Sequence, residues 1–320
     1  MTKSQWMLEL EQYGYVVIPN VIPQVSCDAF VESSLEWLEG FPHGFKRDDR
    51  STWNEEHLPF GQKGGLYNRY SVNHEAFVWK IRTEPGVLKA FEEVWDTDDL
   101  IASFDGLNVS LPVNATTGRS DIKTTNIDQN PRKINRFELY QGIANMAPNG
   151  PSDGGLVVLA GSHRHHEKHF DQIGGFRPQQ DQGVNENGYD YTAEDADWYR
   201  AQGCEEVKIC ANAGDLILWD SRTIHWNASP VGDQIRYITY VCYCPRSMAT
   251  EQELQRKLEV FQERKGTTHW PNMSVIPADG TKKEALPRRP DGSVDPANRY
   301  RPFHEPEETP AVMRLVGVRA

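Results

Sequence analysis

The sequence lacks the long apolar runs that a membrane protein needs. No segment reaches the roughly 18 apolar residues of a membrane span. The first residues, MTKSQWMLELEQYGY, carry Glu and Gln within their apolar pattern, so they lack the unbroken apolar core of a signal peptide. We therefore expect no membrane association and a soluble, cytoplasmic protein.

The sequence also has no excess of basic residues. It contains 34 Lys and Arg against 46 Asp and Glu, which gives a formal net charge of −12. Such a charge disfavours general attraction to nucleic acid or to anionic membranes, because both are negatively charged. We therefore expect no nucleic-acid partner.

Cysteine is scarce, and its spacing matches no common framework. The five residues are Cys27, Cys204, Cys210, Cys242 and Cys244. Their number is odd, and their spacing fits neither a zinc knuckle nor a disulfide framework. We interpret them as reduced thiols in the core.

No low-complexity linker divides the 320 residues, so we expect one domain with insertions. Residues 1–99 would form an N-terminal helix and strand region with a lid loop. Residues 100–246 would form the core, with a polar insert at 171–203 that covers one mouth of a barrel. Residues 247–320 would form a C-terminal helix and an extended tail.

Short β-type runs separated by Gly, Pro, Asn and Asp turns dominate the centre of the chain. This pattern favours a sandwich or barrel over a parallel α/β sheet. The expected strands are Leu100–Leu111, Phe137–Met146, Gly155–Leu159, Glu206–Ile209, Leu216–Trp219 and Ile235–Tyr243. Apolar residues at helical spacing predict helices at Ser4–Tyr13, Val25–Leu38, Glu84–Trp95 and Thr250–Arg264.

Two stretches carry residues with the chemistry of a metal site. LILWDSRTIHWNASPVGDQIR places His225 directly after a β-type run, and Arg236 follows eleven residues later. TTNIDQNP supplies Asp128. Non-haem iron oxygenases bind Fe(II) with two histidines and one carboxylate, often as a His-x-Asp pair plus a distant histidine. The strand period of two turns both members of the short pair toward one interior.

In this chain the short pair reads Asn126-Ile127-Asp128, and the distant histidine is His225. A guanidinium such as that of Arg236 suits the distal carboxylate of a keto-diacid, because its fork binds both oxygens. Each residue also has a plain structural interpretation: a packed core histidine, an aspartate that starts a turn, and a surface arginine. Their joint occurrence in this order favours the site.

A second histidine group lies at His163, His165, His166 and His169. A zinc site is conceivable there, but no cysteine or further ligand pattern accompanies it. We favour a structural role in which the group ends a strand and opens a solvated helix. In the loop before the core, Tyr67, Asn68 and Arg69 are candidates to reach the main site.

The chain resembles the phytanoyl-CoA dioxygenase family of Fe(II)/2-oxoglutarate-dependent oxygenases. The matching motifs span roughly residues 13–246 in the family order. They are YGYVVIPNVI, IDQNP at Ile127–Pro131, NGPSDGGLVVLAGSH at Asn149–His163, AGDLILWDSRTIHWN at Ala213–Asn227, and Arg236. The resemblance implies a mainly β fold with flanking helices, namely a double-stranded β-helix (jelly roll, cupin-like).

The resemblance also implies the cofactors and the roles of single residues. Asp128 and His225 would bind Fe(II), and Arg236 would anchor the distal carboxylate of 2-oxoglutarate, with Asn227 assisting and Lys123 adding a polar contact. With O2, such an enzyme oxidises a C–H bond of a small organic substrate, here a specialised metabolite. A homodimer and a heterodimer both remain open.

The departure from the family pattern is Asn126, where relatives carry histidine. An amide oxygen is a weaker, neutral ligand than an imidazole. Three explanations stay open: a laboratory substitution that traps an inactive form, a silent subunit of an active homologue, or a working enzyme with Asn126, Asp128 and His225 as ligands. A cupin-like binder or isomerase that uses another metal is a further alternative.

Overall fold

The computed structural model describes residues 3–62, 64–112, 125–177, 188–272 and 286–319. Two antiparallel sheets form its centre, with strand orders β1-β10-β6-β12-β4-β2 and β8-β5-β11-β7-β9. The strands are β1 (Tyr15–Ile18), β2 (Leu66–Tyr67), β3 (Leu100–Ala102), β4 (Leu107–Ser110), β5 (Thr125–Ile127), β6 (Tyr140–Asn145), β7 (Gly155–Ala160), β8 (Tyr189–Tyr191), β9 (Glu205–Lys208), β10 (Leu216–Asp220), β11 (His225–Ala228), β12 (Arg236–Tyr240) and β13 (Tyr243–Pro245). The predicted mainly β fold with flanking helices is confirmed.

The two sheets face each other, as the strand β10 illustrates. Ile217 and Trp219 pack inward with Leu156 and Val158 of the opposite sheet, whereas Leu218 packs outward against helices. This alternation follows from the strand period of two, and it makes β10 apolar on both faces. The interior between the sheets therefore has one apolar end, and its other end is the cavity described below.

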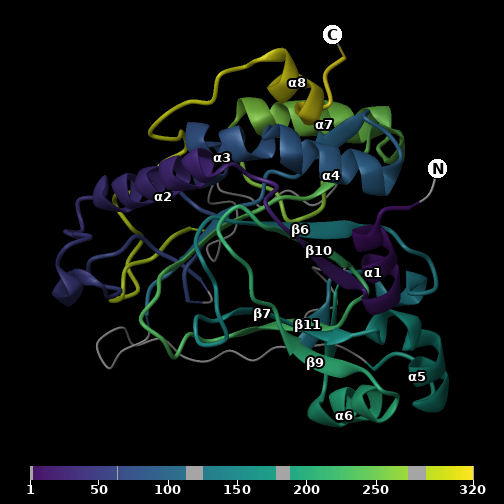
Figure 1. The fold of residues 1–320 in the computed structure, drawn as a ribbon. Coiled ribbons are helices and arrows are strands. Elements are labelled where there is room, and N and C mark those ends of the chain that lie inside the picture. The colour runs from purple at the N-terminus through teal and green to yellow at the C-terminus, as the bar shows by residue number, and fades with distance from the viewer. Residues whose placement is uncertain (1–2, 63, 113–124, 178–187, 273–285, 320) are drawn as a thin grey trace.

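The helices form two groups (Figure 1). They are α1 (Gln5–Tyr13), α2 (Gln24–Glu39), α3 (Ala76–Arg82), α4 (Pro85–Trp95), α5 (His166–Gln172), α6 (Ala193–Ala201), α7 (Glu251–Gln262) and α8 (Pro310–Val316). The helices α2, α3, α4, α7 and α8 lie on the outer side of the six-stranded sheet, and α5 and α6 lie beyond the other sheet. The four predicted helices are confirmed, α5 is the helix expected after the histidine group, and α3, α6 and α8 are additional.

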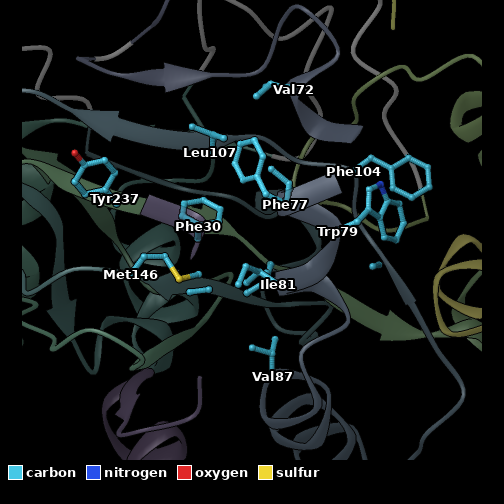
Figure 2. Close-up of a cluster of buried hydrophobic side chains, with 14 of the residues drawn as sticks. Phe30, Val72, Phe77, Trp79, Ile81, Val87, Phe104, Leu107, Met146 and Tyr237 are labelled. Carbon is cyan, nitrogen blue, oxygen red and sulfur yellow. The ribbon is translucent and has the colours of Figure 1, made fainter. Parts of the chain in front are cut away.

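The largest apolar cluster lies between the six-stranded sheet and its helices. Figure 2 shows Phe30 of α2 and Phe77 of α3 near Leu107 of β4, with Tyr237 of β12 on one side and Val87 of α4 at the far end of the cluster. Each such side chain contributes about 1.5–3 kcal/mol when it leaves water. This packing makes the six-stranded sheet a rigid wall on which Arg236, at the start of β12, is fixed.

The run Leu100–Leu111, predicted as one strand, is two strands in two different sheets. β3 pairs with β13, and β4 pairs with β12 and β2. The chain turns between them at Gly106, where an added Cβ would lie 2.0 Å from the carbonyl oxygen of Tyr67. This turn brings Asp105 to the wall of the cavity.

The insert at 171–203 does not cover a barrel mouth in its described part. Tyr189, Tyr191 and Tyr199 pack against Val157 and Trp226, on the outer face of the five-stranded sheet. These tyrosines cover the apolar residues of that outer face. Residues 178–187 of the insert lie outside the described residues, so its expected place over one mouth of the barrel stays a prediction.

The described part of the C-terminal tail is tied to the loop that precedes the core. The Tyr70 hydroxyl donates to Asp295 at 2.6 Å, and Arg289 donates to the carbonyl oxygen of Leu58 at 2.9 Å. The loop at 41–73 is thus held against the tail. Within the described ranges, the structure contains no helix that combines the length and the apolar character of a membrane span.

Candidate metal and co-substrate site

A cavity of about 300 Å³ opens between the two sheets. This volume is at the lower end of the range of small-molecule sites. Its wall contains the polar residues Asp105, Asn108, Ser110, Asn126, Asp128, Gln141, His225, Asn227, Arg236, Tyr240 and His269. Five of the six predicted site residues, Asn126, Asp128, His225, Asn227 and Arg236, therefore lie on one cavity. The sixth, Lys123, lies outside the described residues.

Strand pairing brings the first three of these residues together. Asn126 of β5 is the direct partner of His225 of β11. Asp128 follows β5, where its backbone N–H donates to the carbonyl oxygen of Ser221. His225 Nε2 lies 3.1 Å from Asp128 Oδ2, and Asn126 Nδ2 donates to Asp128 Oδ1 at 3.1 Å.

The hydrogen bonds of His225 select which nitrogen faces the site. Its Nδ1 donates to the carbonyl oxygen of Thr223 at 2.9 Å, which leaves Nε2 toward Asp128. A carbonyl partner of this kind fixes the tautomer of metal-binding histidines. An unprotonated Nε2 and a carboxylate oxygen repel each other, so the pair needs a cation between them, either a proton or a metal ion.

Asp128 is held in its charged form. Burial raises the pKa of this carboxyl, but the imidazoles of His269 and His225 and hydrogen bonds from His225 and Gln141 bring it below its ordinary value. Gln141 Nε2 donates to Asp128 Oδ2 at 3.1 Å. Gln141 is therefore a contact of the Asp128 carboxylate on the cavity wall.

The Asp128–His225 geometry fits a shared metal ion. Two ligand atoms at about 2.1 Å from one ion and at right angles to each other lie about 3.0 Å apart. The observed 3.1 Å between Nε2 and Oδ2 is close to this spacing. The described residues contain no group of three His, Cys, Asp or Glu side chains that could hold a metal. The donor set is therefore one imidazole, one carboxylate and the Asn126 amide.

Arg236 lies on the opposite sheet of the same cavity and is only 4 % exposed. Its hydrogen-bond partner is Tyr240, and burial lowers its pKa. No carboxylate of the described residues lies within ion-pair distance. A buried guanidinium without a counter-ion is costly, so this position suits an anionic ligand.

Gly155 makes room for this guanidinium. Its φ is +99°, and an added Cβ would lie 2.8 Å from Arg236 Nε. Both the backbone conformation and the close approach therefore require glycine. The Gly-Gly pair at 154–155 belongs to the motif at Asn149–His163 that resembles the family. It lets the Arg236 guanidinium approach the start of β7.

Other candidates lie elsewhere. Tyr67 is buried and packs edge-on against Trp37, although the neighbouring Leu66 does line the cavity. The helix that follows His165 has a solvated face, but His166 and His169 lie on its buried face. All five cysteines are free thiols, and Cys210 alone is exposed.

Several polar wall residues have no counterpart in the sequence analysis. Among them, Asp105 and His269 are titratable and interact electrostatically with Asp128. Asp105 lies at the turn between β3 and β4, and His269 follows α7. Neither has a sequence neighbour that marks it as functional. Both reach the cavity because the Phe104 and Thr267 backbones are hydrogen-bonded to each other.

Comparisons with known proteins identify the family and the fold of the chain. The family model described as phytanoyl-CoA dioxygenase (PhyH) matches residues 10–237. The chain is 37% identical over 283 residues to Ava biosynthesis cluster protein O of Aspergillus versicolor, which covers 85% of this chain and 87% of that protein. It is 22% identical to a putative phytanoyl-CoA dioxygenase of Dictyostelium discoideum, with 77% of each chain covered.

Two solved structures share the fold. GlcNAc Inducible Gene 2 of Candida albicans has a TM-score of 0.62 at 13% identity, with 98% of this chain and 80% of that chain covered. The non-heme alpha ketoglutarate dependent epimerase SnoN from nogalamycin biosynthesis has a TM-score of 0.50 at 16% identity, with 76% and 82% covered. The jelly-roll prediction is thereby confirmed. The chain belongs to the phytanoyl-CoA dioxygenase family of Fe(II)/2-oxoglutarate-dependent oxygenases.

Proposed function

We propose that this chain is a working dioxygenase that uses Fe(II), 2-oxoglutarate and O2 to oxidise a C–H bond of a small organic substrate. The observation that carries the proposal is the buried, carboxylate-free Arg236 on the same cavity as the Asp128–His225 pair. A keto-diacid can bridge the two, because one carboxylate pairs with the guanidinium while the other end reaches the metal.

Different residues of the chain bind the metal and the co-substrate. Asp128 and His225 hold the metal, with Asn126 beside them, and Gln141 orients the Asp128 carboxylate by a 3.1 Å hydrogen bond. Arg236 binds the distal carboxylate of 2-oxoglutarate, and Asn227 is a polar neighbour on the same wall. Bound Fe(II), with 2-oxoglutarate and O2, supplies the oxidising power for an unactivated C–H bond.

Apolar residues separate these polar groups from bulk water. Ile143, Leu156 and Trp219 line the cavity and are all at most 3 % exposed. Exclusion of water strengthens the electrostatic contacts of the site and protects reactive species from side reactions. A specialised metabolite is the substrate class that we favour, because the relative from Aspergillus versicolor belongs to a biosynthesis cluster.

The competing proposal is a silent family member that acts as a structural or regulatory subunit. Asn126 is the observation that favours it, because an amide binds metal more weakly than an imidazole. The intact Asp128, His225, Gln141 and Arg236 arrangement argues against it, because a site without selection for binding has no reason to keep a buried unpaired guanidinium.

The test is an anaerobic titration of the protein with Fe(II) and 2-oxoglutarate, followed by addition of O2 and measurement of succinate. We expect a visible charge-transfer band on formation of the ternary complex, and slow succinate release without substrate. Asp128→Ala should abolish both signals. Tight 2-oxoglutarate binding with no succinate under any substrate would favour the silent subunit.

A further inference from the structure

His269 occupies a fixed position on the wall of the cavity. It lies between Thr267 and Trp270, in the segment after α7. The Thr267 N–H donates to the Phe104 carbonyl at 2.8 Å, and the Phe104 N–H donates to Thr267 Oγ1 at 2.8 Å. Trp270 is 3 % exposed. The backbone of His269 is therefore anchored on both sides, and its ring reaches the cavity that contains Asp128.

The Nε2 atom of His269 is shielded from solvent but has no hydrogen-bond partner among the described residues. A buried polar atom without a partner costs about 1–3 kcal/mol. Both ring nitrogens of His225, on the same cavity, do have partners. The unsatisfied nitrogen of His269 is therefore available to a ligand in the cavity once the ring turns.

The groups that act on the Asp128 carboxyl indicate where this contact lies. The His269 imidazole is the strongest of the charged groups that lower the pKa of Asp128, ahead of His225. It also acts on Asp105, whose carboxyl has a pKa raised by burial. His269 and Asp128 line the same cavity, and His269 reaches it from the C-terminal segment after α7.

The metal site beside Asp128 lacks the second imidazole of the family pattern. Asp128 and His225 supply two ligands at the correct spacing, and Asn126 supplies only a neutral amide. Because the described residues contain no group of three such side chains that could hold a metal, His269 has to turn about its side-chain bonds when a metal binds. Rotamer changes of this kind are common on binding.

We propose that His269 supplies the second imidazole of the metal site and so replaces the histidine that Asn126 displaced. The ligand set is then Asp128, His225 and His269, two histidines and one carboxylate drawn from β5, β11 and the segment after α7. The inference rests on the proposed function for the metal itself. It explains why a chain with asparagine at position 126 keeps the rest of the site.

Metal affinity of the full-length protein tests the proposal without reference to turnover. His269→Ala and His269→Gln should each weaken Co(II) and anaerobic Fe(II) binding by about tenfold or more, as the loss of a ligand does. His304→Ala is the matched control, because its side chain is 80% exposed and its loss should leave the affinity unchanged. Pulsed electron paramagnetic resonance of the Cu(II)-loaded protein should detect two bound imidazoles in the wild type and one in His269→Ala.

A rescue variant separates ligation from other roles. Asn126→His in the His269→Ala background should restore the affinity, because it returns an imidazole to the family position. Wild-type metal affinity in both His269 variants overturns the proposal and leaves His269 as a substrate contact. A loss that Asn126→His does not repair overturns it as well. If Asp128→Ala and His225→Ala also bind metal normally, the proposed function itself has failed.

Discussion

Asn126 and His225 are direct partners in the β5–β11 pair, so the residue at position 126 faces the site whatever its type. Asn126→His therefore places an imidazole beside the Asp128 carboxylate. We expect Fe(II) affinity to rise by about tenfold or more, because an imidazole at position 126 faces the metal without the side-chain rotation that His269 needs. Competition with a chelator measures this change, and an unchanged affinity would show that position 126 does not reach the metal.

Arg236 gives a prediction that separates binding from stability. Arg236→Met should abolish 2-oxoglutarate binding, and Arg236→Lys should weaken it by about tenfold or more, because lysine cannot bind both carboxylate oxygens. In the absence of 2-oxoglutarate, Arg236→Met should be no less stable than the wild type, since the guanidinium that it removes is buried without a carboxylate.

Calorimetry and thermal unfolding with and without 2-oxoglutarate check both statements. In the wild type, the ligand should raise the Tm because it binds only the folded state. If Arg236→Met instead unfolds the free protein and retains 2-oxoglutarate binding, the arginine is a structural residue.

Gly155, in β7 of the opposite sheet, should affect the same binding of 2-oxoglutarate. Gly155→Ala places a Cβ 2.8 Å from Arg236 Nε and strains a backbone with φ of +99°. We expect a loss of about 1–3 kcal/mol of stability and at least tenfold weaker 2-oxoglutarate binding. Gly175→Ala is the control, because it has φ of +105° but no atom within 4 Å of the added Cβ.

Comparing the two alanine variants isolates the contact from the backbone strain. Both should lose stability, and only Gly155→Ala should lose affinity. Equal 2-oxoglutarate affinity in the two proteins would mean that Gly155 does not position the guanidinium.

Some residues of the site can be predicted from local sequence patterns. Others reach the site only through contacts between distant segments. The spacing of two between Asn126 and Asp128 and the β-type runs beside His225 and Arg236 reflect strand geometry, which a sequence displays directly. The position of His269 depends on the pairing of Thr267 with Phe104, two segments far apart in the chain. No local pattern encodes such a contact.

The same distinction explains the fold. Long periodic helices and apolar strands were predicted at nearly their observed bounds, because burial imposes the pattern. The break at Gly106 was missed because it results from the close approach of the Tyr67 carbonyl, a tertiary contact. The cover that Tyr189, Tyr191 and Tyr199 give to β7 was not predicted, because a strand that is apolar on both faces does not say which segment will cover it.

Lys257 of α7 provides a prediction on pH and stability away from the site. It is 5 % exposed, its Nζ donates to the carbonyl oxygen of Ala102, and it lies 3.9 Å from the centroid of the Phe104 ring. No carboxylate of the described residues pairs with it. Burial lowers its pKa to about 7, with smaller effects of Cys244, which raises it, and Arg82, which lowers it.

The sign of the effect follows from proton binding. The unfolded lysine has a pKa of about 10.4, so between pH 7 and that value the unfolded state binds more protons than the folded state. Stability from this group therefore rises with pH across the window, with a slope of up to about 1.4 kcal/mol per pH unit. Below pH 7 both states are protonated, and the full cost of burying the charge remains.

Lys257→Met removes the charge and keeps an unbranched side chain of similar length. We expect it to raise stability at pH 7 by about 1–3 kcal/mol, less whatever is lost at the Ala102 carbonyl, and to flatten the rise between pH 7 and pH 9. Urea unfolding at several pH values measures both effects. Lys89→Met is the control, because that side chain is 75% exposed and should leave the slope unchanged. If the wild type and Lys257→Met keep parallel pH profiles, the lysine is charged in the folded protein at pH 9 and its stabilising contacts with Ala102 and Phe104 outweigh its burial.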